Sequence, residues 1–238
     1  SNTEVWVENV DCINASDTDS VAEAIANCDL MATAVGVNVL PHIVPNIVAG
    51  FRKRVEGANN NPLNIIICEN LIDADKLLYK LISEHLGSDE KRIFDEQVGL
   101  VEASVGRMVP VMTEAQKRDN PLRVYVESYC DLPVDQCAFK GDIPEMDHLI
   151  PFTPFAFYIE RKLFIHNMGH AMTAYLGHLL GYKYIWQAID NPYIHSIVRS
   201  AMSESASALS KKFTVSLESI SEHIDDLIVR FANRALGD

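Results

Sequence analysis

The fold is decided by the segment LNIIICEN, residues 63–70, in the N-terminal half of the chain. Its apolar residues run almost without a break from Leu63 to Cys68, which is typical of a strand buried on both faces of a sheet. A helical pattern follows from Asp73 to Leu86, with its leucines on one face, and Gly87 marks its end. A buried strand followed by an amphipathic helix predicts one step of a parallel sheet.

The same order of elements precedes this segment. The apolar run 30–35 ends at Gly36 and predicts another buried strand, and a helix with Pro41 and Pro45 near its start follows it. Strand, helix, strand and helix at these lengths predict a parallel sheet with crossover helices. Further strands are predicted at residues 5–10, 98–105 and 122–127, and a short helix at residues 21–27.

The pattern changes near residue 145. A long helical pattern covers residues 155–180, and two more helices are predicted at residues 191–211 and 217–235. The chain is therefore predicted to be an α/β portion over residues 1–144, followed by an all-helical portion over residues 145–238.

A Gly-rich turn, which normally follows the first strand of a dinucleotide-binding domain, does not occur in this sequence. The spacing G-x-G-x-x-G is nowhere present. Either the α/β portion has a different fold, or the chain starts inside such a domain.

Charge and cysteine content exclude several classes of protein. The formal net charge is −13, so nucleic acid and anionic membranes are not expected partners, although a local basic pocket for a small phosphate is compatible with it. Five cysteines without a C-x-x-C pair argue against a disulfide framework or a zinc ribbon. With no signal peptide and no long apolar stretch, we expect a cytoplasmic protein.

Two predicted strands end in residues that suit a ligand site. Thr33, Ala34, Val35 and Gly36 end the first strand, and Gly36 would let backbone approach a ligand. Glu69 and Asn70 end the second. Because parallel strands place their carboxyl ends at one crevice, both groups are candidates for a binding site. The alternative is structural, with Gly36 in a turn and Asn70 as a helix cap.

A cluster of polar residues interrupts the long apolar helix predicted over residues 155–180. Asn167 and His170 are three residues apart and lie on one face, and Lys162 lies two turns earlier. A desolvated lysine can act as a base near neutral pH, while Asn and His can hydrogen-bond an oxygen on which charge develops. Each residue taken alone also fits a structural or solvated role.

A metal site on the same helix is the weaker alternative. His166 and His170 are four residues apart, which is the spacing of helical metal ligands, but the glutamate of H-E-x-x-H is missing. Acidic residues are scattered rather than clustered, so we expect no metal.

The order of these segments resembles the mannitol dehydrogenase family, the polyol-specific long-chain dehydrogenases. The family pattern K-x4-N-x2-H stands here as Lys162, Asn167 and His170. The resemblance covers nearly the whole chain in five ordered blocks, at residues 33–40, 62–70, 107–110, 139–141 and 160–177.

The resemblance implies a Rossmann-like domain that binds NAD and a mostly helical domain that supplies the catalytic residues, without a metal. Lys162 would be the general base, and Asn70, Asn167 and His170 would hold the reacting oxygen. Thr33, Ala34, Val35, Gly36 and Glu69 would line or support the cofactor site. The implied substrate is a sugar alcohol or its phosphate, most closely mannitol 1-phosphate, interconverted with fructose 6-phosphate.

The chain departs from the family pattern at both ends. The family's Gly-rich turn is expected before Ser1 and a further helical region after Asp238, so we expect a truncated Rossmann-like domain joined to part of a helical substrate domain. Such a fragment would be inactive by itself. The candidate phosphate partners are Arg161, Lys140, Lys211 and Lys212, each of which is equally a plausible surface charge.

Other functions compete with this interpretation. Relatives in the same family act on unphosphorylated mannitol at C2 or reduce hexuronates. A helical interaction domain is the non-enzymatic alternative, and a metal-dependent hydrolase using His166 and His170 is the third. In every enzymatic case we expect small-molecule partners and a monomer or weak dimer.

Overall fold

The computed structural model describes residues 3–110 and 112–238. The chain divides into two units, which are treated separately below. The sheet unit comprises residues 1–102 and 138–143, and the helical unit comprises residues 103–137 and 144–238. Among the described residues, no helix has both the length and the apolar content that a bilayer span requires.

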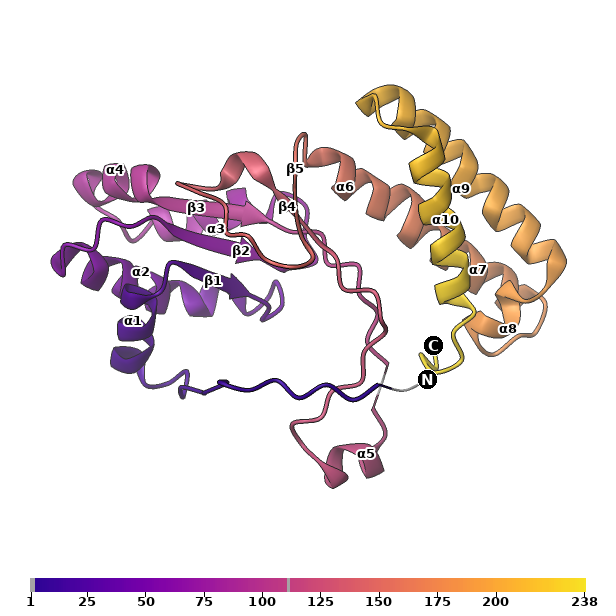
Figure 1. Cartoon of the computed structure of the whole chain (residues 1–238), viewed down its shortest axis with the longest axis horizontal. Coiled ribbons are helices and arrows are strands. Elements are labelled where there is room, and N and C mark those ends of the chain that lie inside the picture. Colours follow the sequence, from indigo (N-terminus) through magenta and orange to yellow (C-terminus); the bar gives the residue numbers. More distant parts are fainter. Residues whose placement is uncertain (1–2, 111) are drawn as a thin grey trace. The chain divides into compact units, whose positions relative to one another are not determined.

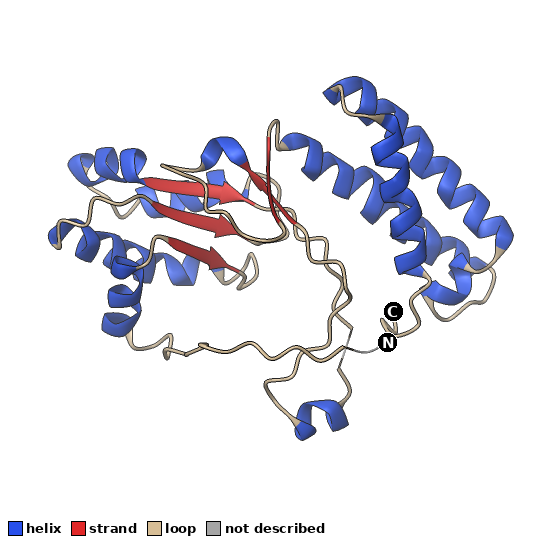
Figure 2. Ribbon diagram, viewed as in Figure 1, coloured by secondary structure: helices blue, strands red, loops and turns tan. Residues whose placement is uncertain are grey.

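The sheet unit is a three-stranded parallel sheet in the order β1-β2-β3, joined by helices (Figures 1 and 2). The strands are β1 (Leu30–Thr33), β2 (Leu63–Ile67) and β3 (Val98–Glu102). The helices are α1 (Thr18–Asn27), α2 (Leu40–Glu56), α3 (Ala74–Ser83) and α4 (Ser88–Gln97). The arrows of β1, β2 and β3 in Figure 2 point the same way, so the carboxyl ends of these strands share one edge of the sheet.

Strand β2 is the centre of this sheet, and all five of its residues are buried. Leu63, Ile65 and Ile67 belong to the apolar core that β2 shares with α2, α3 and α4. Asn64 alternates with these residues along the strand. Its side-chain amide donates to the carbonyl of Lys140 and accepts from the N–H of Lys140, in the returning segment 138–143. Burial on both faces explains why the sequence of β2 does not alternate.

A buried arginine fastens helix α2 to the loops that precede two strands. Arg54 is 1% exposed, and its guanidinium donates to the carbonyls of Ala26, Cys28 and Asn61, with a further bond to Asp29. These bonds satisfy carbonyls at the end of α1 and in the loops before β1 and β2. Arg54 therefore fixes where β1 and β2 begin.

The helical unit contains a two-stranded parallel pair, β4 (Leu132–Asp135) and β5 (Leu149–Phe152), followed by helices. The first long helical path consists of α6 (Ala156–Arg161), the π-helical segment η2 (Lys162–Asn167) and α7 (Met168–Leu179). Helices α8 (Ile185–Ile189), α9 (Pro192–Phe213) and α10 (Leu217–Phe231) pack against it. A short helix α5 (Glu114–Asp119) and a 3-10 turn η1 (Gln136–Ala138) complete the elements.

The core of this unit lies between the first helical path, α9 and α10. Ile165 of η2 is completely buried, as are Met202 of α9 and Leu227 of α10. Each helix contributes one apolar face, as the helical spacing predicted. The first helical path is thereby held against two long helices.

Two predicted strands are wrong. Residues 5–10 and 122–127 are neither helical nor strand-paired, and Trp6 and Leu122 are 76% and 88% exposed. Their β-branched and aromatic content is typical of strands, but a strand needs a pairing partner, and the described residues do not provide one. The strand predicted at 98–105 ends at Glu102, while β4, β5, α4 and α8 were not predicted.

The fold class itself is confirmed. A parallel sheet with crossover helices precedes a mainly helical portion, and the crossovers follow the predicted strand and helix order. The catalytic candidates of the sequence divide between the two units accordingly.

Candidate active site

The loop after β1 forms the first part of the candidate site. Gly36 has φ +89°, a conformation that costs glycine little, and a Cβ built there would meet nothing within 4 Å. Ala34, Val35 and Gly36 are exposed, whereas Thr33 is 2% exposed. The loop thus presents open backbone at the carboxyl edge of the sheet.

Glu69 holds this loop in place from the end of β2. Its Oε1 accepts the Val35 N–H at 3.0 Å and its Oε2 accepts the Gly36 N–H at 2.8 Å. Glu69 is 7% exposed, so these charge-assisted bonds are shielded from water. This geometry makes Glu69 a positioning residue for the loop. The next residue, Asn70, is exposed at the same edge.

Two observations fit a dinucleotide at this edge. Backbone can approach a ligand at Gly36, where no side chain intervenes. Thr33 Oγ1 is buried without a hydrogen-bond partner among the described residues, which is uncommon unless a site supplies one. Both features lie where an open parallel sheet binds its ligand.

The π-helical segment η2 covers Lys162 to Asn167, the K-x4-N part of the motif. At 3.6 residues per turn, side chains five apart would point about 140° away from each other. A π-turn, whose hydrogen bonds join residues five apart, winds more loosely, so Lys162 and Asn167 lie closer to one face of the helix than they would in an α-helix. His170 follows Asn167 by three residues in α7 and continues the same face. The π-turn aligns the motif, and the sequence analysis did not predict it.

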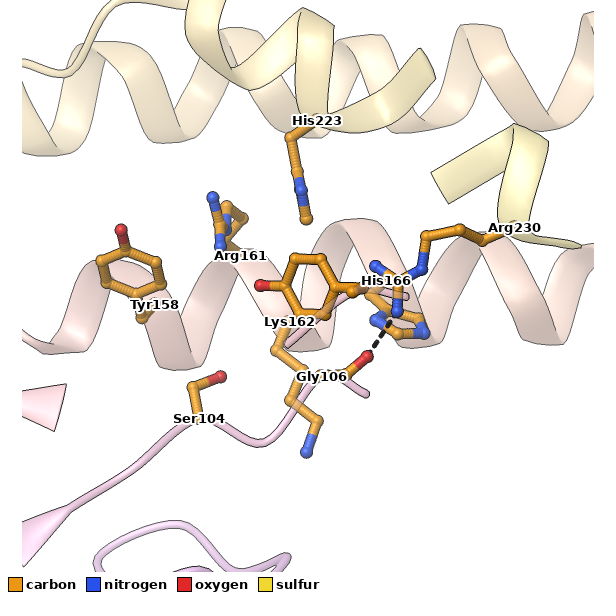
Figure 3. Close-up of a pocket in the computed structure, with 9 residues that line it drawn as sticks. Ser104, Gly106, Tyr158, Arg161, Lys162, His166, His223 and Arg230 are labelled. Atoms are coloured by element: carbon orange, nitrogen blue, oxygen red, sulfur yellow. Dashed lines mark hydrogen bonds between the residues drawn. The ribbon is translucent and has the colours of Figure 1, made fainter. Parts of the chain in front are cut away.

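Burial lowers the pKa of the Lys162 ammonium below its usual value. Desolvation is the cause, because removing water disfavours the charged form. Figure 3 shows Lys162 and Arg161 leaving the helix in opposite directions, Lys162 toward the segment that carries Ser104 and Gly106. A lysine in this state is suited to accept and return a proton.

A small pocket surrounds these two residues within the helical unit. Its free volume is about 20 Å³, little more than one water needs, so a larger group enters only if side chains move. It contains no carboxylate among its lining residues, which are Ser104, Gly106, Tyr129, Tyr158, Arg161, Lys162, His166, His223 and Arg230. The pocket therefore has a positive character.

Arg230 ties the pocket together through a buried ion pair. Its guanidinium meets both carboxylate oxygens of Glu127 at 2.6 and 2.9 Å, and the two side chains are 8% and 6% exposed. It also donates to the Gly106 carbonyl. These contacts fix the segment carrying Gly106 and Glu127 to helix α10.

Arg161 differs, because no carboxylate among the described residues lies within ion-pair distance of it. Its guanidinium lies 4.4 Å from the Tyr158 ring centroid and 5.6 Å from that of Phe157, and it is hydrogen-bonded to Tyr129. Burial lowers the pKa of Arg161. A buried guanidinium balanced by aromatic rings is suited to an incoming anion.

The other candidate phosphate partners are less well placed. Lys212 forms an ion pair with Glu160 at 2.6 Å, and Lys211 is exposed on α9. Lys140 belongs to the sheet unit, where its backbone bonds Asn64. Of the four, Arg161 alone lines the pocket with Lys162.

Two histidines of the pocket are kept neutral by burial. Desolvation, aided by the nearby arginines, lowers the pKa of His166 to about 4 and that of His223 to about 3. At neutral pH both rings can therefore donate or accept a hydrogen bond without adding charge.

Asn167 and His170 do not line this pocket. Asn167 is exposed, and His170 Nε2 lies 3.0 Å from an Asp238 oxygen. The His170 ring also packs 5.3 Å from Phe231. Of the three motif residues, only Lys162 lines the pocket, and His170 is held by its contact with Asp238.

The only group among the described residues with metal-ligating geometry is Cys130, Asp131 and His148. It contains neither His166 nor His170, so the geometry gives no support to the predicted hydrolase alternative.

Pocket residues that were not predicted from the sequence include Tyr129, His223 and Arg230, and His166 was considered only as a metal ligand. The only sequence signal for His223 was a histidine within the mainly polar run SEHIDD, residues 221–226. Arg230 had no local signal, because its partner Glu127 lies 103 residues away.

Comparison with known protein families finds matches over both portions of the chain. Residues 1–148 match the family of mannitol dehydrogenase Rossmann domains, and residues 155–238 match that of mannitol dehydrogenase C-terminal domains.

Solved structures agree in fold. D-sorbitol dehydrogenase in substrate-free form matches with a TM-score of 0.80 at 15% identity, covering 93% of this chain and 53% of that one. Pseudomonas fluorescens mannitol 2-dehydrogenase, in a ternary complex with NAD and D-mannitol, matches with a TM-score of 0.71 at 17% identity, covering 94% and 53%. The chain spans about half the length of both.

Proposed function

Because the chain belongs to the mannitol dehydrogenase family, we propose that it forms part of an NAD-dependent polyol dehydrogenase in which Lys162 is the general base. The observation that carries the proposal is the partly desolvated Lys162 at the start of a π-turn that also contains Asn167. The matched structure with NAD and D-mannitol supports the same class of ligands.

The sheet unit contributes the cofactor side of the proposed site. Gly36 leaves room for the cofactor, and Glu69 keeps the loop at Val35 and Gly36 in the conformation that admits it. Bound NAD supplies the acceptor for the hydride that leaves the polyol carbon. Asn70, exposed at the same strand end, would help to hold the reacting hydroxyl, as the family resemblance implies.

The helical unit contributes proton transfer. In the oxidation direction, neutral Lys162 Nζ takes the proton of the polyol hydroxyl, and the C–O bond becomes a carbonyl as hydride leaves the carbon. Asn167 and His170 hydrogen-bond that oxygen while it carries partial negative charge. In the reverse direction the Lys162 ammonium returns its proton to the carbonyl oxygen. No step requires a metal.

The finer proposal is that the substrate is phosphorylated, as in mannitol-1-phosphate 5-dehydrogenase. Arg161 supports it, because this largely buried cation lines the pocket of Lys162 and has no carboxylate partner among the described residues. A phosphate dianion would neutralise the positive charge of the Arg161 guanidinium. Mannitol 2-dehydrogenase and hexuronate reductase remain the alternatives within the family.

The test of the general base uses the full gene product with NAD. Lys162→Ala should lower kcat by a factor on the order of 10²–10⁴, the range of general-base loss. In the unaltered enzyme, oxidation needs neutral lysine and should rise with pH through the lysine pKa, while ketone reduction needs the ammonium and should fall. Lys211→Ala, an exposed lysine on α9, is the matched control. Normal kcat and an unchanged pH profile in Lys162→Ala would refute the assignment.

The same assays separate the substrates. With mannitol 1-phosphate, mannitol and a ketohexuronate compared in parallel, Arg161→Met should raise KM for the phosphorylated polyol about tenfold or more. KM for mannitol should stay unchanged. A substrate preference for mannitol that Arg161→Met does not alter would remove the phosphate proposal and leave the polyol dehydrogenase intact.

A further inference from the structure

The starts of the parallel strands β4 and β5 bring three metal-ligating side chains together. Cys130 and Asp131 precede β4, and His148 precedes β5. Leu132 pairs with Leu149 in the strand register, so Asp131 and His148 occupy the adjoining pair of positions. Residues far apart in sequence are thus placed side by side by strand pairing.

The ligand atoms of this group are close enough to share one ion. One ligand atom from each of Cys130, Asp131 and His148 lies within 4.8 Å of the others. His148 Nδ1 is already 2.9 Å from Asp131 Oδ1. Ligands of a tetrahedral zinc ion with bonds of about 2.0–2.3 Å stand somewhat over 3 Å apart, so small side-chain rotations suffice.

We propose that Cys130, Asp131 and His148 form a binding site for a divalent transition metal, with Zn²⁺ as the best match. Thiolate, imidazole and carboxylate are the three ligand types that zinc uses in proteins. Asp131 and His148 are exposed, with 48% and 57% of their side-chain surface accessible, so water completes the coordination. The site shares no residue with the pocket of Lys162, and the proposed proton transfer does not involve it.

The ion would act as a clip on the chain. It joins the residues before β4 to the residue before β5. It thereby closes the connection between these two strands, residues 136–148, into a loop. Closing a loop of this length removes entropy mainly from the unfolded chain. The ion would also offset the charge of Asp131, which acts electrostatically on Arg161.

The test is a titration of reduced, chelator-treated protein with Co²⁺, a spectroscopic substitute for Zn²⁺. One equivalent should bind and produce a thiolate-to-cobalt charge-transfer band in the near ultraviolet, and Zn²⁺ should displace it. Because no substrate is used, the outcome is independent of the proposed dehydrogenase activity.

The variants identify the ligands. Cys130→Ser should abolish the thiolate band, and His148→Asn should weaken binding about tenfold or more. Asn is chosen because His148 has φ +64°, which asparagine tolerates. Cys137→Ser, an exposed cysteine outside the group, is the control and should retain the band. No thiolate band in the unaltered protein, or a band that persists in Cys130→Ser, would overturn the proposal.

Discussion

Arg54 in the sheet unit and Arg230 in the helical unit are both buried, but their partners differ. Arg54 donates mainly to backbone carbonyls, and its one carboxylate partner, Asp29, is 66% exposed. Arg230 is paired with Glu127, whose side chain is 6% exposed. The sheet unit therefore fixes its loops with neutral acceptors near water, whereas the helical unit fixes its pocket with an enclosed ion pair.

The same contrast applies to the candidate residues of the two units. Glu69 orders the loop at Val35 and Gly36 through backbone N–H groups, so a strand end and a turn define that geometry. In the helical unit, the register of η2 places Lys162, and burial sets its proton affinity. Changes of helix register and of pH should therefore affect the helical unit selectively.

The largest expected effect comes from moving the lysine by one position. In an α-helix residue 163 would neighbour Asn167, and the looser winding of the π-turn brings residue 162 toward the same face. The double variant Lys162→Leu, Leu163→Lys keeps composition and charge, yet kcat of the full gene product should fall by about 10² or more. The Lys162→Ala variant measured in parallel gives the reference loss. Turnover within tenfold of the unaltered enzyme would show that the π-turn does not align the site.

The next effect concerns stability and compares the two arginines directly. Arg230→Met leaves Glu127 buried without its partner and should cost about 3–5 kcal/mol, as for other broken buried ion pairs. Arg54→Met should cost less, because the Asp29 carboxylate and the nearby loop carbonyls can recruit water. Denaturant unfolding of each variant measures the difference. Equal losses of unfolding free energy in the two variants would mean that enclosing the ion pair adds nothing to its effect on stability.

The smallest effect is the response to acid. His166 and His223 have a folded-state pKa of about 4 and about 3, below the value of about 6.5 expected in the unfolded chain. Their stability contribution is complete above pH 6.5 and is lost as pH falls toward the folded-state values, since the unfolded chain then binds more protons. At pH 5 the loss should be about 2 kcal/mol for each histidine.

Urea unfolding at a series of pH values between 7.5 and 5 measures this loss. His223→Phe should flatten the pH dependence by about half, since it removes one of the two titrating groups. Lys211→Ala should leave the slope unaltered. An unchanged slope in His223→Phe would contradict burial of a neutral histidine.

The sequence by itself determined the elements whose signals are local. The nearly unbroken apolar run of β2, the amphipathic face of α3, and the long helical patterns after residue 155 follow from side-chain periodicity, and the structure confirms them. The K-x4-N-x2-H spacing also identified the residues of the proposed base and its neighbours, because a motif is visible without coordinates.

The tertiary structure alone decided what depends on partners distant in sequence. Residues 5–10 and 122–127 have strand-like composition but no strand to pair with, whereas the short β4 and β5 pair because the chain returns to the same place. Arg230 pairs with Glu127, 103 residues away, and Ile165 within the π-turn is buried in a core that α9 and α10 share. Pairing, burial and proton affinity are properties of the surroundings of a residue, and these exist only once the chain has folded.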